Sequence, residues 1–170
     1  TNANGCIGGI GTILINTPTQ IIITPSTTSV ICYGESNGTA TASVSGGTGP
    51  YTYLWSDGQT TATAIGLTSG TYTCTITDAN FCIITSASIF VGEPTQTVIT
   101  EFNTPVSCNG GSNGSATVSV SGGGFPWGCV WSNGATGFSI TGLSFGSYSY
   151  TVTNANGCIG GIGTILINTP

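Results

Sequence analysis

Apolar and polar residues alternate along most of this 170-residue chain. In the stretch TYTCTITD, Tyr72, Cys74 and Ile76 share one parity and threonines fill the other. SYSYTVTN, further along, has the same pattern around Tyr148. A period of two indicates half-buried β-strands, and turn sequences such as SGGTGP, SDG and DAN separate the runs. About seven short strands in each stretch of about 76 residues predict small antiparallel β-sandwiches.

The sequence realigns on itself without gaps at an offset of 76 residues, the interval from Cys32 to Cys108. This internal repeat divides the chain into two predicted β-sandwich domains, unit A (residues 19–94) and unit B (residues 95–170). The overall prediction is an all-β protein made of tandem immunoglobulin-like antiparallel β-sandwiches in an extended array.

Residues 1–18 are identical to residues 153–170, which end unit B, and match the end of unit A only loosely. We interpret residues 1–18 as the terminal strand segment of a preceding repeat, so that A and B units alternate in a longer secreted protein. The alternative is a donor strand that completes a sheet in another molecule.

One tryptophan and one tyrosine of each unit are expected in its core. They are Trp55 and Tyr72 in unit A, and Trp131 and Tyr148 in unit B. The spacing Leu67-x-x-Gly70-x-Tyr72 is similar to the tyrosine corner of immunoglobulin-like sandwiches, in which the tyrosine hydroxyl bonds to the backbone a few residues upstream. Unit B repeats this spacing.

The charge inventory excludes several classes of function. The chain has no Lys, Arg or His and five acidic residues, so nucleic acid and anionic lipid are excluded as partners because both require basic residues. No apolar run is long enough to span a bilayer. Without His or Lys no general base is available for catalysis, and no cofactor or metal is expected. A weak calcium site near Asp57 or Asp78 is the alternative to reading both residues as turn formers.

Seven cysteines indicate an oxidising compartment. Because two of them recur at the same spacing in both units, we predict the disulfides Cys32–Cys82 and Cys108–Cys158, with free structural thiols as the alternative. Cys6 copies Cys158, so its expected partner is the equivalent of Cys108 in the preceding repeat.

Cys74 and Cys129 break the repeat, because each aligns with a tyrosine of the other unit. We predict that both are buried free thiols, since a tyrosine–cysteine exchange between touching positions conserves core volume. Asn37 and Asn113 begin acceptor sequences for N-glycosylation at equivalent positions. A Ser-Asn-Gly turn explains the same residues without modification.

The ordered motifs of each unit resemble the SprB repeat. They run Cys-x-Gly-x-Ser-Asn-Gly-x-Ala (from Cys32 and from Cys108), Ser-Gly-Gly, Trp-Ser-[Asp/Asn]-Gly, Gly-Leu-x-x-Gly-x-Tyr and Ala-Asn-x-Cys. Phe81 departs from the pattern, replacing the usual glycine before Cys82. The resemblance implies a giant cell-surface adhesin of Bacteroidota, exported by type IX secretion and associated with gliding motility.

Two functions from different classes fit the sequence. The leading one is a non-catalytic structural segment of a long extracellular filament or stalk on the cell surface, with neighbouring repeats as its partners. The other is a carbohydrate-binding module that uses aromatics such as Tyr51, Trp127 or Phe138 to hold surface polysaccharide. An aromatic side chain exposed in both units would favour the carbohydrate-binding module.

Overall fold

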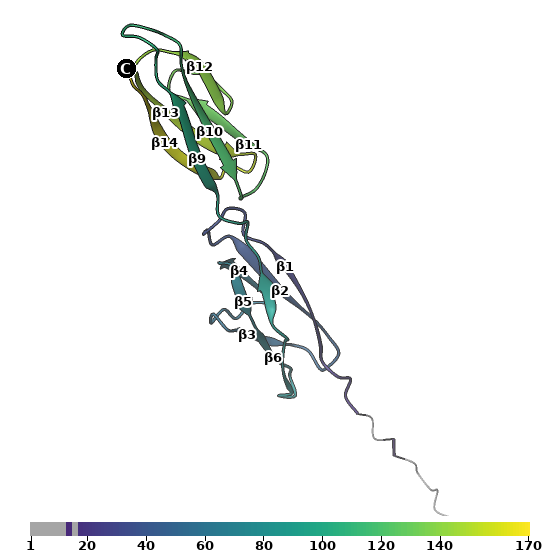
Figure 1. Ribbon diagram of the computed structural model, residues 1–170. Helices are drawn as coiled ribbons and strands as arrows, with labels where there is room; N and C mark the ends of the chain where they lie inside the picture. Colours follow the sequence, from purple (N-terminus) through teal and green to yellow (C-terminus); the bar gives the residue numbers. More distant parts are fainter. Residues whose placement is uncertain (1–12, 15–16) are drawn as a thin grey trace, which may run out of the picture.

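The computed structural model describes residues 13–14 and 17–170, and it arranges the chain as two β-sandwiches that follow one another along a rod (Figure 1). All described elements are strands, and every strand pairing is antiparallel. The predicted all-β fold class is confirmed. None of the described residues forms a helix that is long and apolar enough to cross a membrane.

Unit A contains eight short strands. They are β1 (Ile22–Thr28), β2 (Gly38–Ser45), β3 (Thr52–Trp55), β4 (Thr63–Leu67), β5 (Gly70–Tyr72), β6 (Cys74–Thr77), β7 (Ile83–Thr85) and β8 (Ile89–Val91). One layer has the order β1-β2-β4, and the other consists of β3-β6-β7 together with the pair β5-β8.

Unit B has the same plan with fewer strands, because two of its strands are continuous where unit A has two short ones. They are β9 (Val98–Thr104), β10 (Gly114–Ser121), β11 (Trp127–Trp131), β12 (Ser139–Leu143), β13 (Gly146–Asn154) and β14 (Ile159–Ile167). Its layers are β12-β10-β9 and β11-β13-β14. Strand β13 corresponds to β5 and β6 joined, and β14 to β7 and β8 joined. In unit A the interruption lies where Ser86 bonds Cys74, its hydroxyl oxygen accepting from the Cys74 amide at 3.0 Å.

Each unit has its own hydrophobic core, and the two cores use equivalent positions. The tryptophans Trp55 and Trp131 are both 2% exposed. Each indole N–H donates at 2.8 Å to a backbone carbonyl, that of Thr61 or of Gly137. The buried clusters are Val30, Ala40, Ala42, Trp55, Ala64, Leu67, Cys74, Ile76, Ile89 and Val91 in unit A, and Val106, Ala116, Val118, Cys129, Trp131, Ile140, Leu143, Tyr150, Val152, Ile165 and Ile167 in unit B.

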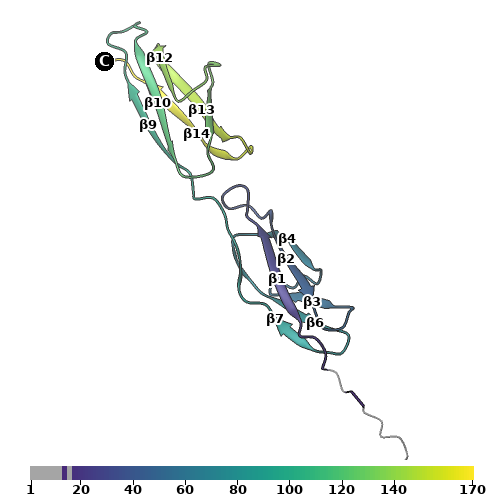
Figure 2. The ribbon, with the colours of Figure 1, turned by 90° about the vertical axis from the view of Figure 1, so that its right-hand side faces the viewer.

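The antiparallel strands divide the loops of each unit between two ends. In unit A the β1–β2 loop lies at the end facing unit B, and the β6–β7 turn lies at the far end, beside the start of the unit (Figure 2). In unit B the β13–β14 turn faces unit A, and the β9–β10 loop lies at the outer end (Figure 1). Each unit therefore has different loops at its two ends.

Phe81, the departure from the repeat pattern, lies in the β6–β7 turn with a φ of 64°. Its counterpart in unit B is Gly157, with a φ of 82°. Glycine adopts this left-handed conformation without a Cβ clash, whereas phenylalanine adopts it at a cost of roughly 1 kcal/mol. The Phe81 ring is 86% exposed, so burial of the side chain does not offset that cost.

One buried polar side chain holds each of these turns. Asp78 is 5% exposed and accepts backbone N–H groups of Thr48, Asn80 and Cys82 at 2.9–3.0 Å. In unit B, Asn154 accepts the equivalent turn amides, but its Nδ2 donates to the carbonyl of Gly124 at 3.0 Å. Three backbone donors, the Cys82 amide foremost, lower the pKa of Asp78 below its ordinary value.

Replacing this carboxylate should weaken unit A in a pH-dependent way. In Asp78→Asn, an amide N–H₂ would face the Thr48 N–H, so one hydrogen bond is lost and two donors oppose each other. Because the folded-state pKa of Asp78 is lowered, its contribution is complete above the unfolded-state value near 4 and disappears as the pH falls through the lower folded-state value. We expect denaturant titrations to show a lower midpoint for the variant at pH 7 and a smaller difference at pH 2.

The matched control is Asp57→Asn, in an exposed turn where unit B already has Asn133. Its midpoint should equal that of the unaltered chain at both pH values. Equal midpoints for Asp78→Asn and Asp57→Asn at pH 7 would contradict the role given to Asp78.

Candidate functional site: the joint between the units

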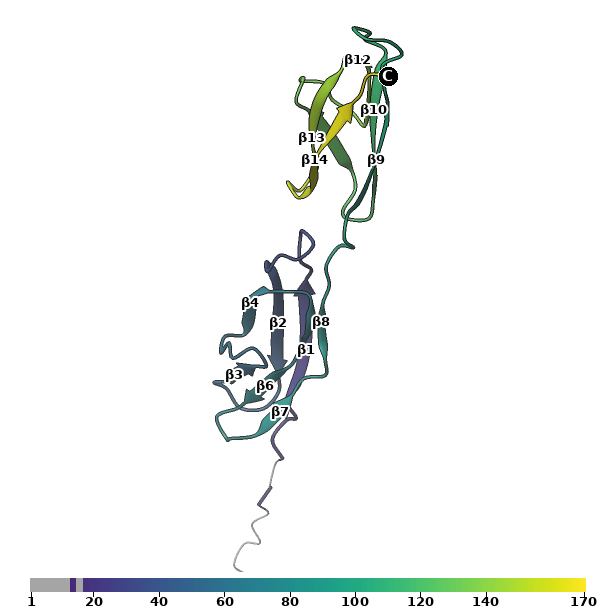
Figure 3. The same ribbon diagram turned by 60° about the vertical axis from the view of Figure 1, so that its left-hand side comes forward.

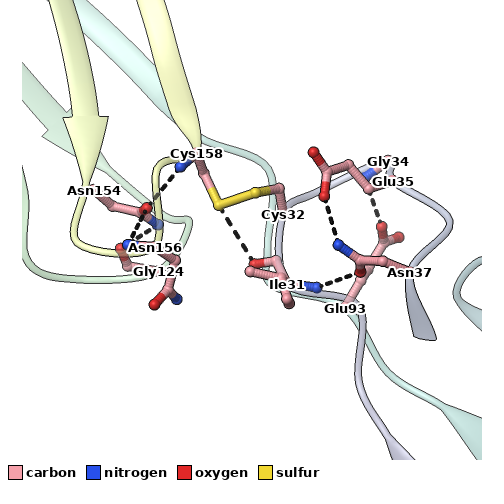
Figure 4. The surroundings of a disulfide bond; sticks show 10 residues. All are labelled: Ile31, Cys32, Gly34, Glu35, Asn37, Glu93, Gly124, Asn154, Asn156 and Cys158. Atoms are coloured by element: carbon pink, nitrogen blue, oxygen red, sulfur yellow. Dashed lines mark hydrogen bonds between the residues drawn. A yellow bond between two sulfur atoms is a disulfide. The ribbon is translucent and has the colours of Figure 1, made fainter. Parts of the chain in front are cut away.

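The most specific chemical feature of the structure is a disulfide between the two units. Cys32, in the β1–β2 loop of unit A, is bonded to Cys158, in the β13–β14 turn of unit B (Figure 4). The two Cα atoms are 5.6 Å apart, and 126 residues separate the cysteines in sequence. Figure 3 shows the two loops facing each other across the joint.

This pairing corrects the predicted bridges Cys32–Cys82 and Cys108–Cys158. Within one unit, the β1–β2 loop and the β6–β7 turn lie at opposite ends of the sandwich, so their cysteines cannot approach each other. Cys82 and Cys108 are exposed free thiols. The spacing from Cys32 to Cys82 equals that from Cys108 to Cys158 because the unit is repeated. This equal spacing is as consistent with a disulfide between consecutive units as with one inside each unit.

The loop that carries Cys32 is fixed from two sides. The side-chain oxygen of Asn37 accepts the Ile31 N–H at 2.9 Å, and the carboxylate of Glu93 accepts the Gly34 N–H at 2.9 Å (Figure 4). Glu93 belongs to the connection between β8 and β9, and its neighbour Gly92 accepts the Val30 N–H at 2.8 Å. The connection and the disulfide-bearing loop of unit A therefore form one hydrogen-bonded structure.

The turn that carries Cys158 is fixed by Asn154, whose Oδ1 accepts the Cys158 N–H at 2.9 Å. Cys158 is buried, at 7% exposure, and its sulfur lies 3.6 Å from the carbonyl oxygen of Ile31. A cleft of about 200 Å³ remains at the joint. Its walls come from the Ile31–Tyr33 segment of unit A and, on unit B, from residues that include Trp127 and Gly160.

The two other predicted cysteines, Cys74 and Cys129, are free and buried. Burial raises the pKa of both thiols, which keeps them protonated and poorly nucleophilic near neutral pH. Cys129 and Tyr150 lie in one core cluster, and Tyr53 packs against the cluster that contains Cys74. Each unit therefore has one tyrosine and one cysteine of the exchanged pair in or against its own core.

In unit B the exchanged tyrosine forms two contacts that the cysteine of unit A cannot form. The Tyr150 ring centroid lies 5.4 Å from that of Trp131, and its hydroxyl donates to the carboxylate of Glu101 at 2.6 Å. Burial and this acidic partner raise the pKa of Tyr150 above its usual range. The Tyr150 hydroxyl therefore stays protonated and donates its hydrogen bond to Glu101. This bond links β9 of one layer to β13 of the other.

The two corner tyrosines adopt the same local geometry. The hydroxyl of Tyr72 donates to the Thr68 carbonyl at 3.0 Å, and that of Tyr148 donates to the Ser144 carbonyl at 3.2 Å. Both tyrosines are half-buried. Each bond returns to the residue four positions upstream and fixes the turn before β5 or β13.

The two candidate glycosylation sites have a visible structural use. Asn37 and Asn113 are exposed, and each accepts a backbone N–H of the cysteine-bearing loop. The Nδ2 of Asn37 also donates to Glu35, and that of Asn113 donates to the hydroxyl of Ser107. These nitrogen atoms, to which a glycan would be attached, are therefore engaged in holding the loops.

Among the described residues, no group of three or more His, Cys, Asp or Glu side chains is arranged to hold a metal ion. Asp57, one of the two calcium candidates, bonds to Gln59 within its own turn. Cys6 lies outside the described residues, and so do most of residues 1–18, so the array and donor-strand interpretations stay predictions.

The family comparison agrees with the motifs. The SprB repeat model matches residues 24–60 and 100–136, one segment in each unit. The chain therefore carries two SprB repeats, which confirms the resemblance. No curated protein matches the chain. Together with the disulfide, the two repeats indicate a secreted or surface-located protein.

Three solved structures are similar in fold at low identity. A C-terminal 282-residue fragment of intimin, solved with the intimin-binding domain of its translocated receptor, is 16% identical, with a TM-score of 0.43. The similarity covers 90% of this chain and 64% of that fragment. The amphioxus IgVJ-C2 molecule is 14% identical (TM-score 0.35; 91% of this chain, 99% of that one), and domains 4–9 of the surface layer protein SbsC are 16% identical (TM-score 0.33; 90% and 30%).

The joint predicts a reactivity pattern for the described cysteines. In the oxidised native chain, Cys82 and Cys108 should react with iodoacetamide within minutes because both are exposed. Cys74 and Cys129 should react only after denaturation, and Cys32 and Cys158 only after reduction. Mass spectrometry of chymotryptic peptides reads each site. Trypsin is of no use, since the chain has no Lys or Arg. Protection of Cys82 in the native chain would contradict the observed pairing.

Proposed function

We propose that this chain is a non-catalytic structural segment of a long extracellular filament or stalk of a cell-surface adhesin, with a role in surface attachment or gliding motility. The observation that carries the proposal is the disulfide between Cys32 and Cys158, which joins consecutive units in addition to the peptide chain. Two covalent connections at one joint restrict bending and twisting, as a stalk requires. The SprB repeats support the extension of the proposal to gliding-type adhesins of Bacteroidota that use type IX secretion.

The disulfide also changes the path of a pulling force. Tension applied to the two ends of the chain passes from Cys32 directly to Cys158, so the 33–157 segment lies outside the covalent path. Only the first strand of unit A and the last strand of unit B can then be peeled away. This arrangement limits the extension of the chain under tension.

The surface composition suits an extracellular stalk. With no Lys, Arg or His and only five acids, the chain has no side-chain salt bridge for salt to weaken. Threonine and serine hydroxyls instead pair across strands, as Thr28 does with Thr39 at 2.7 Å and Thr104 with Ser115 at 2.7 Å. We expect a stiffness that changes little with ionic strength.

Single-molecule pulling tests the proposal directly. Under non-reducing conditions, about 125 residues should stay outside the extensible path, and reduction should release about 430 Å of additional contour length, at 3.3–3.6 Å per residue. Cys32→Ser should show the released length without any reductant. The matched control, Cys108→Ser, alters the equivalent cysteine of unit B, which is free in this structure, and should behave like the unaltered chain. Equal contour lengths with and without reductant would refute the mechanical role.

Carbohydrate binding is a second candidate, favoured by one groove. Phe125, Trp127 and Phe138 line a cavity of about 450 Å³ beside β10 in unit B. The corresponding residues of unit A are Gly49, Tyr51 and Ala62, so the groove is not repeated. The exposed aromatics are Tyr33, Phe81, Phe90, Phe102, Phe125, Phe138 and Phe145. None of them has an exposed aromatic counterpart in the other unit, which favours the stalk.

Affinity electrophoresis separates the two candidates. Because the chain carries a net charge of −5, a neutral polysaccharide is the suitable ligand class, and native gels containing dextran or soluble starch are the probe. A carbohydrate-binding groove would retard the chain, and Phe138→Ala would restore its mobility while the exposed control Phe145→Ala would not. We expect the same mobility for all three proteins.

A further inference from the structure

We propose that the opposite joint, from unit B to a following unit A, is cross-linked in the same way, by a disulfide between Cys108 and Cys82 of the next copy. The partner is an A unit with the sequence of residues 19–94, joined in tandem behind Pro170. Every joint of the array would then carry one disulfide from the β1–β2-type loop of one unit to the last turn of the next.

The first observation is that the two free exposed cysteines are the repeat equivalents of the two bonded ones. Cys108 corresponds to Cys32, and Cys82 corresponds to Cys158. The bond Cys32–Cys158 therefore shows, in this chain, what a pair of these positions does when two units are consecutive. Cys108 belongs to the β9–β10 loop and Cys82 to the β6–β7 turn. These two segments lie at the outer ends of unit B and unit A, where the next joints would form (Figures 1 and 2).

The loop that presents Cys108 has the geometry of the loop that presents Cys32. The Ser107 N–H donates to the side chain of Asn113 at 3.0 Å, as the Ile31 N–H donates to that of Asn37 at 2.9 Å. The carbonyl of each cysteine accepts the N–H three residues later, at 3.0 Å for Cys108 and 3.2 Å for Cys32. Unit B thus holds its cysteine in the conformation that forms the bond in unit A.

The receiving turn is matched in the same way. The Cys82 N–H donates to Asp78 at 2.9 Å, as the Cys158 N–H donates to Asn154 at 2.9 Å. A second hydrogen bond closes each turn. The Asp78 N–H donates to the carbonyl of Cys82, and the Asn154 N–H donates to that of Cys158, both at 3.0 Å. Both halves of the second joint are therefore present, one at each end of the molecule.

The surface around Cys82 is the uncovered counterpart of the joint. A cavity of about 380 Å³ lies there, lined by residues that include Gln20, Asp78 and Ile83. Their equivalents Gln96, Asn154 and Ile159 line the cleft of about 200 Å³ at the existing joint, where the Ile31–Tyr33 segment of unit A covers them. The segment that would cover the cavity at Cys82 is 107–109 of a preceding unit B, with Cys108 at its centre.

The sequence also contains the order of units that the proposal needs. Residues 1–18 have the sequence of the end of unit B, and Thr19 begins unit A directly after them. A unit A therefore follows the terminal segment of a B-type unit at Pro18 without a spacer. The same order behind Pro170 would place Cys82 of the next copy beside Cys108, as Cys158 lies beside Cys32.

The chemistry needs only a small disulfide as oxidant, such as oxidised glutathione. The Cys108 thiolate attacks the oxidant's disulfide and releases one thiol, and the thiolate of the next Cys82 then displaces the second. One S–S bond forms, two protons and two electrons leave the protein, and the oxidant becomes two thiols. Both cysteines are exposed, so the oxidant reaches them.

A tandem of the full chain and a second copy of residues 19–170 tests this proposal, with Thr19 of the second copy directly behind Pro170 of the first. The first copy carries Cys82→Ser and the second carries Cys108→Ser, which leaves one Cys108 and one Cys82 at the central joint. After refolding in a glutathione redox buffer, free thiols are alkylated and the chain is cut with chymotrypsin. We expect the peptide containing Cys108 to be disulfide-linked to the peptide containing Cys82 in more than about nine molecules of ten.

The matched control exchanges the substitutions, so that the remaining Cys82 and Cys108 lie at the two far ends of the tandem. In that protein both should be alkylated. The Cys32–Cys158 bond, present in both tandems, shows that oxidation has occurred. Alkylated Cys108 and Cys82 at the central joint, a bond from either to another cysteine, or equal linkage in both tandems would each overturn the proposal.

This inference uses the tandem order on which the proposed stalk also rests, but the two can fail separately. The pulling experiment on the single chain depends on Cys32 and Cys158 alone. The peptide experiment depends on Cys82 and Cys108. A stalk with a bond at every second joint would pass the first and fail the second.

Discussion

Because consecutive strands of an antiparallel sandwich each run along the unit, its loops must be shared between two opposite ends. That constraint decides which residues of this molecule can meet. The β1–β2 loop of unit A and the β13–β14 turn of unit B are brought to the same place, although 126 residues separate their cysteines. Residues of one unit that are closer in sequence, such as Cys32 and Cys82, are held apart at its two ends.

Much of this organisation could be predicted from the sequence because it rests on local patterns. The alternation of period two predicted strands, and the offset between Cys32 and Cys108 predicted two units of one plan. The disulfide pairing could not be predicted in this way. A spacing that recurs in both units is equally consistent with bonds inside units and bonds between neighbours, and only the placement of the loops separates the two.

Two local details were also beyond sequence reasoning. Unit A has the two strands β5 and β6 where unit B has the single strand β13, and the interruption lies where the Cys74 N–H donates to the side chain of Ser86, which falls between β7 and β8. The choice of carboxylate or amide at Asp78 and Asn154 depends on whether a backbone N–H or a carbonyl faces it from the preceding loop. In both cases the deciding atom comes from a segment distant in sequence.

If every joint carries its disulfide, the loops that the bonds close overlap, and this has a mechanical consequence. One covalent path crosses from Cys32 to Cys158 and then follows about 26 residues to the next Cys32, at most about 90 Å when extended. A second path crosses from Cys108 to Cys82 of the next copy and then follows an interval of equal length forward to Cys108 of that copy. The first path contains only the Cys32–Cys158 disulfides, and the second contains only the Cys108–Cys82 disulfides. Reduction of one bond therefore leaves the second path intact, and the array would extend appreciably only where neighbouring joints are both reduced.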